Sequence, residues 1–283
     1  MAGKIKIVRT VKDLRRQTSA WRRSEERIAL VPTMGALHDG HLSLVKLARR
    51  KADRVVVSIF VNPTQFAPSE DLARYPRDEA GDVKKLEGAG AGLIWTPSVT
   101  EMYPEGFSTG IKPGSAAEPL EGEFRPHHFS GVATVCCKLF GQVTPDVAIF
   151  GEKDFQQLAV LRQMVRDLNL PLAIIGAPTK REKDGLAMSS RNAYLTPAER
   201  RIAPALNKTL LELAHHVRGG GDPEKLAAGA VKALLAAGFS KVDYVAVRDA
   251  ETLRPAKFSK GQALRALATA WLGKTRLIDN VPI

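Results

Sequence analysis

The stretch Arg27-Ile-Ala-Leu-Val-Pro-Thr-Met-Gly-Ala-Leu-His-Asp-Gly-His-Leu-Ser-Leu-Val-Lys-Leu-Ala48 decides the fold. Its apolar run at 28–31 predicts a buried strand, which a proline and a glycine then end. The apolar residues that follow the second histidine predict a helix with an apolar face. His38 and His41 lie where the strand turns into this helix, and Gly40 between them leaves room for a ligand to approach the backbone.

Phosphate is the ligand that this turn suits best. The N-terminus of a helix carries unpaired N–H groups and a partial positive charge. Imidazoles beside it can hydrogen-bond a phosphate whose charge changes in a transition state. However, two histidines near a turn are often exposed caps, and His-x-x-His is also half of a metal site. This short motif alone leaves those alternatives open.

Composition indicates a globular protein of the cytoplasm. The 283 residues, 44% hydrophobic and 25% charged, are enough for one large domain or two modest ones. No apolar run approaches the ~18 residues of a membrane span, and the N-terminal residues lack the apolar segment of a secretory signal. We therefore expect a cytoplasmic location and no membrane partner. The adjacent Cys136 and Cys137 are interpreted as reduced core residues.

The net charge of +12 is the unusual feature of the composition. A basic protein can bind nucleic acid, a membrane surface or small anions. The lysines and arginines are scattered, and aromatic residues make up only 6%, which argues against a surface for base stacking. The sequence therefore favours a solvated basic face with a pocket for a polyanionic substrate, and no nucleic-acid partner.

Alternating strand and helix patterns predict an α/β fold with a doubly wound (Rossmann-like) parallel sheet, followed by a small α+β domain. We place the boundary between residues 177 and 185, which gives domains 1–180 and 181–283. The expected strands are 4–8, 28–31, 54–61, 92–96, 146–150, 171–176, 241–247, 263–272 and 275–279, the last three antiparallel. The expected helices are 11–26, one that ends near 51, 78–88, 131–142, 155–168, 196–218 and 223–237. The segments 62–78 and 97–122 are expected to be loops.

Candidate segments follow the strands at 28–31, 54–61 and 146–150, and doubly wound sheets bind ligands at the carboxyl ends of strands. After the third strand, Gly151 lets the backbone close on a phosphate and Lys153 supplies a positive charge. Asp154 either caps the next helix or accepts from a ribose hydroxyl. As a lone tetrapeptide, 151–154 is more often an ordinary turn.

Two further segments suit the same kind of substrate. Met188-Ser-Ser-Arg-Asn192 stands at the domain junction, where two hydroxyls and a guanidinium can clamp a triphosphate. An ordinary linker explains it equally well on its own. Neutral amides after the strands suit a substrate with hydroxyls and a carboxylate that must stay reactive. These amides are Asn62, Gln65, Gln156 and Gln157.

Together, these segments resemble the signature motifs of the pantothenate synthetase family, in order and over nearly the whole chain. The motifs are Pro32-Thr-Met-Gly-Ala-Leu-His-Asp-Gly-His41, Phe60-Val-Asn-Pro-Thr-Gln-Phe66, Arg125-Pro-His-His-Phe-Ser-Gly-Val132, Gly151-Glu-Lys-Asp-Phe-Gln-Gln157, Met188-Ser-Ser-Arg-Asn192, Asp243-Tyr-Val-Ala-Val-Arg-Asp249 and Arg276-Leu-Ile-Asp-Asn280. Any one of them is weak, but seven in register are specific. The resemblance implies ATP-dependent condensation of pantoate with β-alanine through a pantoyl adenylate, giving pantothenate, AMP and pyrophosphate.

The resemblance also implies roles for individual residues. The catalytic set is His38, His41, Lys153, Ser189 and Arg191, with His38 as the proton donor. The ATP-binding set is Met34, Gly35, His38, Gly40, His41, Gly151, Glu152, Lys153, Asp154, Lys180, Met188, Ser189, Ser190 and Arg191. The pantoate-binding set is Asn62, Gln65 and Gln157. ATP enters as a substrate with Mg²⁺, and the family implies a homodimer.

Some positions depart from the family pattern. His127 stands where a smaller or neutral residue is expected, so the roles of His127 and His128 are open. Lys180 replaces a residue that is often apolar near the adenine, where a backbone contact would survive the change. Asp82 is a possible Mg²⁺ ligand, although a solvated helix charge is the favoured interpretation.

The sequence leaves two rival functions open. The resemblance implies membership of the nucleotidyl-transferring superfamily marked by His-x-Gly-His, and an adenylyltransferase of that superfamily would act on a phosphorylated acceptor and release no AMP. A nucleic-acid-binding module related to a tRNA synthetase would explain the charge and the His-x-Gly-His motif. The lack of an anticodon-type domain and of aromatic-basic patches counts against the second rival.

Overall fold

The computed structural model describes residues 5–67, 72–255 and 261–283, and the chain forms two compact units. The first unit consists of residues 1–152 and 160–178, and the second of residues 153–159 and 179–283. The sequence places all of 1–180 in one domain, whereas the short segment 153–159 packs with the second unit. The expected strand start at Lys4 and loop residue Asp71 lie outside the described residues.

The first unit is built on a six-stranded parallel sheet, as the sequence predicts. Its strand order is β1-β4-β3-β2-β5-β6, so the chain reverses its direction of travel across the sheet between β2 and β5. Ligands of such sheets bind at this switch point. The strands are β1 (Lys6–Val8), β2 (Ile28–Thr33), β3 (Arg54–Ile59), β4 (Leu93–Trp95), β5 (Val147–Gly151) and β6 (Ala173–Ala177).

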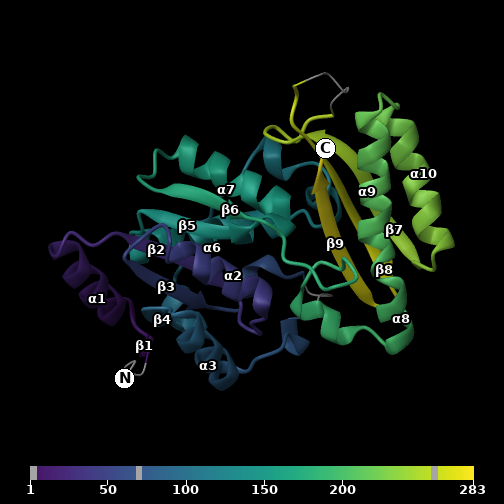
Figure 1. The fold of residues 1–283 in the computed structure, drawn as a ribbon. Helices are drawn as coiled ribbons and strands as arrows, with labels where there is room; N and C mark the ends of the chain where they lie inside the picture. The colour runs from purple at the N-terminus through teal and green to yellow at the C-terminus, as the bar shows by residue number, and fades with distance from the viewer. Residues whose placement is uncertain (1–4, 68–71, 256–260) are drawn as a thin grey trace. The chain divides into compact units, whose positions relative to one another are not determined.

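Helices cover both faces of this sheet (Figure 1). Val55 and Val57 of β3 join the apolar core beneath α2, because alternate strand residues face the same side. The opposite face is packed by α6, with α1 beside α6. The helices of this part are α1 (Val11–Arg23), α2 (Asp39–Ala48), α3 (Glu79–Ala89), α4 (Val99–Met102), α5 (Glu121–Phe124), α6 (His128–Val143) and α7 (Phe155–Asp167). The short α4 lies within the segment 97–122 that the sequence predicts to be a loop, and the short α5 begins at the end of that segment.

The two cysteines differ in their surroundings. Cys136 is buried in α6, and burial raises the pKa of its thiol to about 12. Cys137 is only partly buried, so the core interpretation holds for Cys136 and is wrong for Cys137.

The second unit is a three-stranded antiparallel sheet packed against helices, as expected of an α+β domain. Its elements are α8 (Pro197–Ile202), α9 (Ala205–Arg218), α10 (Pro223–Ala236), β7 (Lys241–Asp249), β8 (Leu264–Leu272) and β9 (Thr275–Pro282). The single helix expected over 196–218 is wrong, because Pro204 lacks an N–H group and separates α8 from α9. The expected cap is confirmed, since Thr196 and Glu199 form a capping box. No helix in the described part of the chain is long and apolar enough to cross a membrane.

A buried carboxylate, Asp243, ties β7 to its neighbouring strands. It accepts from Lys241 Nζ at 2.9 Å, from Arg276 Nε at 2.8 Å and from Trp271 Nε1 at 3.0 Å. Burial by itself raises the pKa of Asp243, but these donors outweigh it and hold the pKa below the ordinary 3.8.

We expect Asp243→Asn to lower the free energy of unfolding by about 3 kcal/mol at neutral pH, because the partly buried Arg276 loses its counter-charge. A depressed pKa means that this stabilisation is present above pH 3.8 and is lost as pH falls through the folded-state value. Urea unfolding of both proteins therefore shows a difference that shrinks below about pH 4. A difference independent of pH contradicts this. Asp184→Asn, in an exposed pair with Arg200, is the control and costs at most about 1 kcal/mol.

Candidate active site

The turn after β2 carries two consecutive residues with left-handed backbone. Gly35 has φ of +81° and Ala36 has φ of +51°, a conformation that an alanine adopts only when its surroundings hold it there. The holding group is the carboxylate of Asp82 on α3. Its Oδ2 accepts from Ala36 N and its Oδ1 from Leu37 N, both at 2.8 Å. A Cβ on Gly35 would stand 3.1 Å from Asp82 Oδ2, so the turn and the carboxylate fit closely.

Asp82 is therefore not a solvated helix charge, and that interpretation is wrong. The residue is 1% exposed. Burial raises its pKa, and the two backbone donors and Lys85 offset part of that rise. Both carboxylate oxygens already bind backbone N–H groups, which is a structural role. Within the described ranges, no three His, Cys, Asp or Glu side chains are grouped to hold a metal ion.

The two histidines cap α2 reciprocally. His38 Nδ1 accepts from Gly40 N at 3.1 Å, and His41 Nδ1 accepts from His38 N at 3.3 Å. A neutral imidazole whose Nδ1 accepts carries its proton on Nε2, so both rings are fixed as Nε2–H donors. The ring centroids are 4.2 Å apart. The cap interpretation and the phosphate interpretation are thus compatible, because each function uses a different ring nitrogen.

Several backbone N–H groups of this turn have partners within the protein. We expected backbone N–H groups of the turn to receive phosphate. Those of Ala36, Leu37, His38 and Gly40 instead donate to side chains of the protein itself. The imidazole Nε2–H groups are further donors of this turn.

Asn62 and Gln65 follow β3, the neighbour of β2. Asn62 is 1% exposed, and its Nδ2 donates to Gln65 Oε1 and to Gly131 O, both at 3.2 Å. Its Oδ1 accepts from Thr64 and from the hydroxyl of Tyr103, the latter at 2.8 Å. Protein partners thus occupy the whole amide, which favours a positioning role for Asn62 over the predicted direct contact with pantoate.

Gln65 is held from several sides. Its Nε2 donates to Met34 Sδ at 2.9 Å, and its backbone carbonyl contacts His128 Nδ1 at 3.1 Å and Arg125 Nη2 at 3.4 Å. A role thus appears for His128, the open position of the sequence analysis, while His127 is exposed. Sequence reasoning missed Tyr103, because a tyrosine in a Pro/Gly-rich stretch carries no signal of what it contacts.

The phosphate-binding candidates of the second unit lie on two segments. Lys153 Nζ stands 3.6 Å from Asp154 Oδ1 in a 3₁₀ turn before α7, so the carboxylate of Asp154 is a direct neighbour of this ammonium. On the other segment, Ser189 accepts from Arg191 N and caps a 3₁₀ helix. Lys153, Ser189 and Arg191 line one small pocket.

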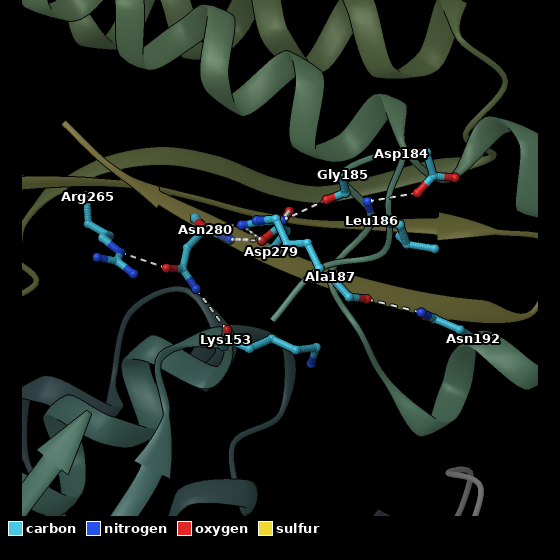
Figure 2. A network of polar contacts seen from close by, with 10 residues as sticks. Lys153, Asp184, Gly185, Leu186, Ala187, Asn192, Arg265, Asp279 and Asn280 are labelled. Carbon is cyan, nitrogen blue, oxygen red and sulfur yellow. Dashed lines mark hydrogen bonds and ion pairs between the residues drawn. The ribbon is translucent and has the colours of Figure 1, made fainter. Parts of the chain in front are cut away.

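A backbone hydrogen bond joins Lys180 to the start of the segment Met188–Arg191. Met188 N donates to the carbonyl of Lys180 at 3.0 Å, so the backbone of Lys180 has a structural role that its side chain does not affect. Arg181 makes two hydrogen bonds to Asp279, at 2.7 and 2.9 Å, and one to Gly185 O at 3.0 Å. This network fixes the 181–187 turn that leads into Met188–Arg191 (Figure 2).

Comparison with known proteins adds a full-length match to this geometry. The sequence profile of the family described as pantoate-beta-alanine ligase matches residues 6–282. The chain belongs to the pantoate–β-alanine ligase family.

Similar members of the pantoate–β-alanine ligase family cover the chain from end to end. The pantothenate synthetase of Mesorhizobium japonicum is 57% identical over 98% of this chain and 97% of its own. That of Paramagnetospirillum magneticum is 56% identical over 100% and 99%. The crystal structure of pantothenate synthetase from Thermus thermophilus has a TM-score of 0.91 at 46% identity, covering 98% of this chain and 99% of its own. A Francisella tularensis pantoate-beta-alanine ligase, complexed with beta-gamma ATP and beta-alanine, has a TM-score of 0.81 at 34% identity, covering 98% and 97%.

The remaining site residues predicted from the pantoate–β-alanine ligase family are divided between the two units. Gly151 closes β5, the strand that neighbours β2 across the switch point, and Glu152 follows it in the first unit. Gln156 is buried and Gln157 half-buried in the first turn of α7, within the second unit. Ser190 opens the 3₁₀ helix Ser190–Tyr194.

Proposed function

We propose that this chain condenses pantoate with β-alanine at the expense of ATP, giving pantothenate, AMP and pyrophosphate. The observation that carries the proposal is the histidine pair at the switch point, whose Nδ1 atoms accept from backbone N–H groups. This places the donor proton of each ring on Nε2, the atom that we assign to the phosphates of ATP. The family match over residues 6–282 supports pantoate as the acid.

In the first step, a carboxylate oxygen of pantoate attacks the α-phosphorus of ATP, and the bond from that phosphorus to the bridging oxygen of pyrophosphate breaks. The product is a pantoyl adenylate. The step moves negative charge onto the phosphate oxygens and the leaving pyrophosphate, which fixed donors stabilise. His38 and His41 provide Nε2–H donors, while Lys153, Ser189 and Arg191 hold the triphosphate chain. No protein nucleophile is needed, because positioning and charge stabilisation account for the chemistry.

In the second step, the amine of β-alanine attacks the acyl carbon of the adenylate, the C–O bond to AMP breaks and the amine loses a proton. Gln65 is the residue we assign to the oxygens of pantoate, with Asn62 and His128 holding it in place. A neutral amide suits this task, since it binds hydroxyl and carboxylate oxygens without protonating the nucleophile. Gln157 stays a predicted pantoate contact.

Mg²⁺ is proposed as the companion of ATP. Mg²⁺ is usually held by substrate phosphates with one or two carboxylates and waters, not by an all-protein cage. Mg²⁺ carried by the phosphates would add positive charge at the triphosphate. Lys153 and Arg191 are the side chains we assign to the remaining phosphate charge.

The decisive experiment is ATP–pyrophosphate exchange with pantoate and Mg²⁺ but without β-alanine. We expect exchange only when pantoate is present, and net release of AMP only after β-alanine is added. Exchange without pantoate, or none with it, would contradict the proposal. Phosphorylated acceptors would then be tested for adenylyl transfer, the rival function. The family resemblance further predicts a cytoplasmic homodimer. Light scattering of the purified chain tests the predicted oligomeric state.

A further inference from the structure

Two adjacent buried residues of β9 hold the two phosphate-binding segments of the second unit. The carboxylate of Asp279 binds Arg181 and thereby the 181–187 turn. The amide of Asn280 reaches the carbonyl of Lys153, 127 residues away in the chain (Figure 2). The role of Asn280 toward Lys153 follows from the geometry of this second contact.

The side chain of Asn280 is locked in one orientation. Its Nδ2 donates to Lys153 O at 2.8 Å, and its Oδ1 accepts from Arg265 Nε at 2.6 Å. A guanidinium has no acceptor, so the amide oxygen must face Arg265 and the amide nitrogen must face Lys153. Asn280 is 2% exposed, and a hydrogen bond shielded from water in this way is stronger and costlier to lose.

Arg265 is itself fixed at both ends. Leu267 of β8 stands opposite Asn280, which makes Arg265 the diagonal neighbour of Asn280 on the same sheet face. The guanidinium carbon lies 4.2 Å from the ring centroid of Phe155, within cation–π range. Phe155 comes two residues after Lys153. Arg265 and Asn280 therefore contact the segment 153–155 at two points, the ring of Phe155 and the carbonyl of Lys153.

We infer that Asn280 is a positioning residue for Lys153, acting through the backbone of that lysine. The inference rests on the proposed function, in which the Lys153 ammonium meets the phosphates of ATP. A lysine is a point charge on a flexible stem, so where its backbone is anchored decides which atoms the ammonium reaches. Asn280 touches no substrate in this arrangement, and Arg265 sets the direction in which its amide points.

Asn280→Asp is the sharpest probe, because it is nearly isosteric and keeps the acceptor for Arg265. It replaces the donor facing Lys153 O with a carboxylate oxygen, which repels that carbonyl. We expect kcat/KM for ATP in pantoate-dependent ATP–pyrophosphate exchange to fall about 10-fold to 100-fold. The KM for pantoate changes less than about twofold, since Lys153 is not assigned to pantoate.

A double-mutant cycle separates positioning from general damage. If Asn280 acts through Lys153, then Asn280→Asp has less than about a twofold effect in a Lys153→Ala background. Equal losses in both backgrounds, or no loss in the wild-type background, would overturn the inference while leaving the proposed function intact. Lack of pantoate-dependent exchange in the wild-type enzyme would instead refute the proposed function, and the inference with it.

Two further variants make the result unambiguous. Arg218→Ala removes a hydrogen bond to Pro282 O on the same strand without touching either phosphate-binding segment, so we expect wild-type exchange. A loss equal to that of Asn280→Asp would assign the effect to the strand and overturn the inference. Should Asn280→Asp fail to fold, Arg265→Lys serves instead: it keeps the charge but loses the planar contact with Phe155. It is expected to lower kcat/KM for ATP in the same direction, and an unchanged value would count against the inference.

Discussion

His41→Ala is expected to lower the rate of pantoate-dependent ATP–pyrophosphate exchange about 10²-fold to 10³-fold, the size of effect seen when one preorganised donor to a developing charge is lost. The physical reason is the Nε2–H donor that the structure assigns to His41. The same substitution also removes the Nδ1 acceptor that caps α2 through His38 N. The rate loss by itself therefore does not distinguish the donor from the cap.

His41→Asn distinguishes them. Its short amide offers an oxygen near the position of Nδ1, so it can keep the cap, but it has no atom at the position of Nε2. We expect the same loss of exchange as in His41→Ala together with a thermal unfolding midpoint closer to that of the wild-type enzyme. Recovery of the wild-type rate in His41→Asn would refute the phosphate contact. His215→Ala, an exposed histidine of α9, is the control and is expected to exchange at the wild-type rate.

The sequence predicted the architecture well because periodicity and chain breakers carry most of that information. The nearly uninterrupted β-branched run after Arg54 indicated a strand covered on both faces, and β3 is such a strand. The error at α8 and α9 has a simple origin. The cap at Thr196 and the glycines after Arg218 are genuine helix ends, but Pro204 between them was not given its weight as a helix breaker.

The site was predictable only where a motif names the residue. His38, His41 and Lys153 could be picked out as candidates because their side-chain types suit phosphate chemistry and they follow the ends of strands. The structural roles of Asp82 and Asn280 could not be predicted, because each depends on a contact 45 or more residues away in the chain. A carboxylate on an amphipathic helix is usually solvated, and only the folded chain brings Asp82 to the turn before α2.

The second large effect is expected when Asp82, which holds the left-handed backbone of that turn, is replaced. Asp82→Ala leaves the N–H groups of Ala36 and Leu37 without their acceptor and releases Ala36 from its left-handed backbone. We expect the free energy of unfolding to fall by about 3 kcal/mol in urea titrations. We also expect exchange to slow about 10²-fold, because the turn sets the position of His38.

Two further variants, Asp82→Asn and Glu79→Ala, test how much of this effect comes from the buried carboxylate. An amide retains one acceptor oxygen, so Asp82→Asn keeps one of the two backbone bonds and is expected to lose roughly half as much stability. Glu79 lies on the same helix in an exposed pair with Arg9, and its removal is expected to cost at most about 1 kcal/mol. Equal losses for Asp82→Ala and Glu79→Ala would contradict a structural role for the buried carboxylate.

A magnesium titration decides between the two roles considered for Asp82. If the carboxylate were a ligand of Mg²⁺, its loss would weaken metal binding, and a higher Mg²⁺ concentration would restore exchange in Asp82→Ala. If it holds the turn, as its two 2.8 Å bonds to backbone N–H groups indicate, excess Mg²⁺ restores nothing and the stability loss persists without metal or ATP. We expect the second result. Unfolding measured in the presence of a chelator then gives the same difference from wild type as unfolding in Mg²⁺, because the defect belongs to the backbone of the turn and not to a bound ion.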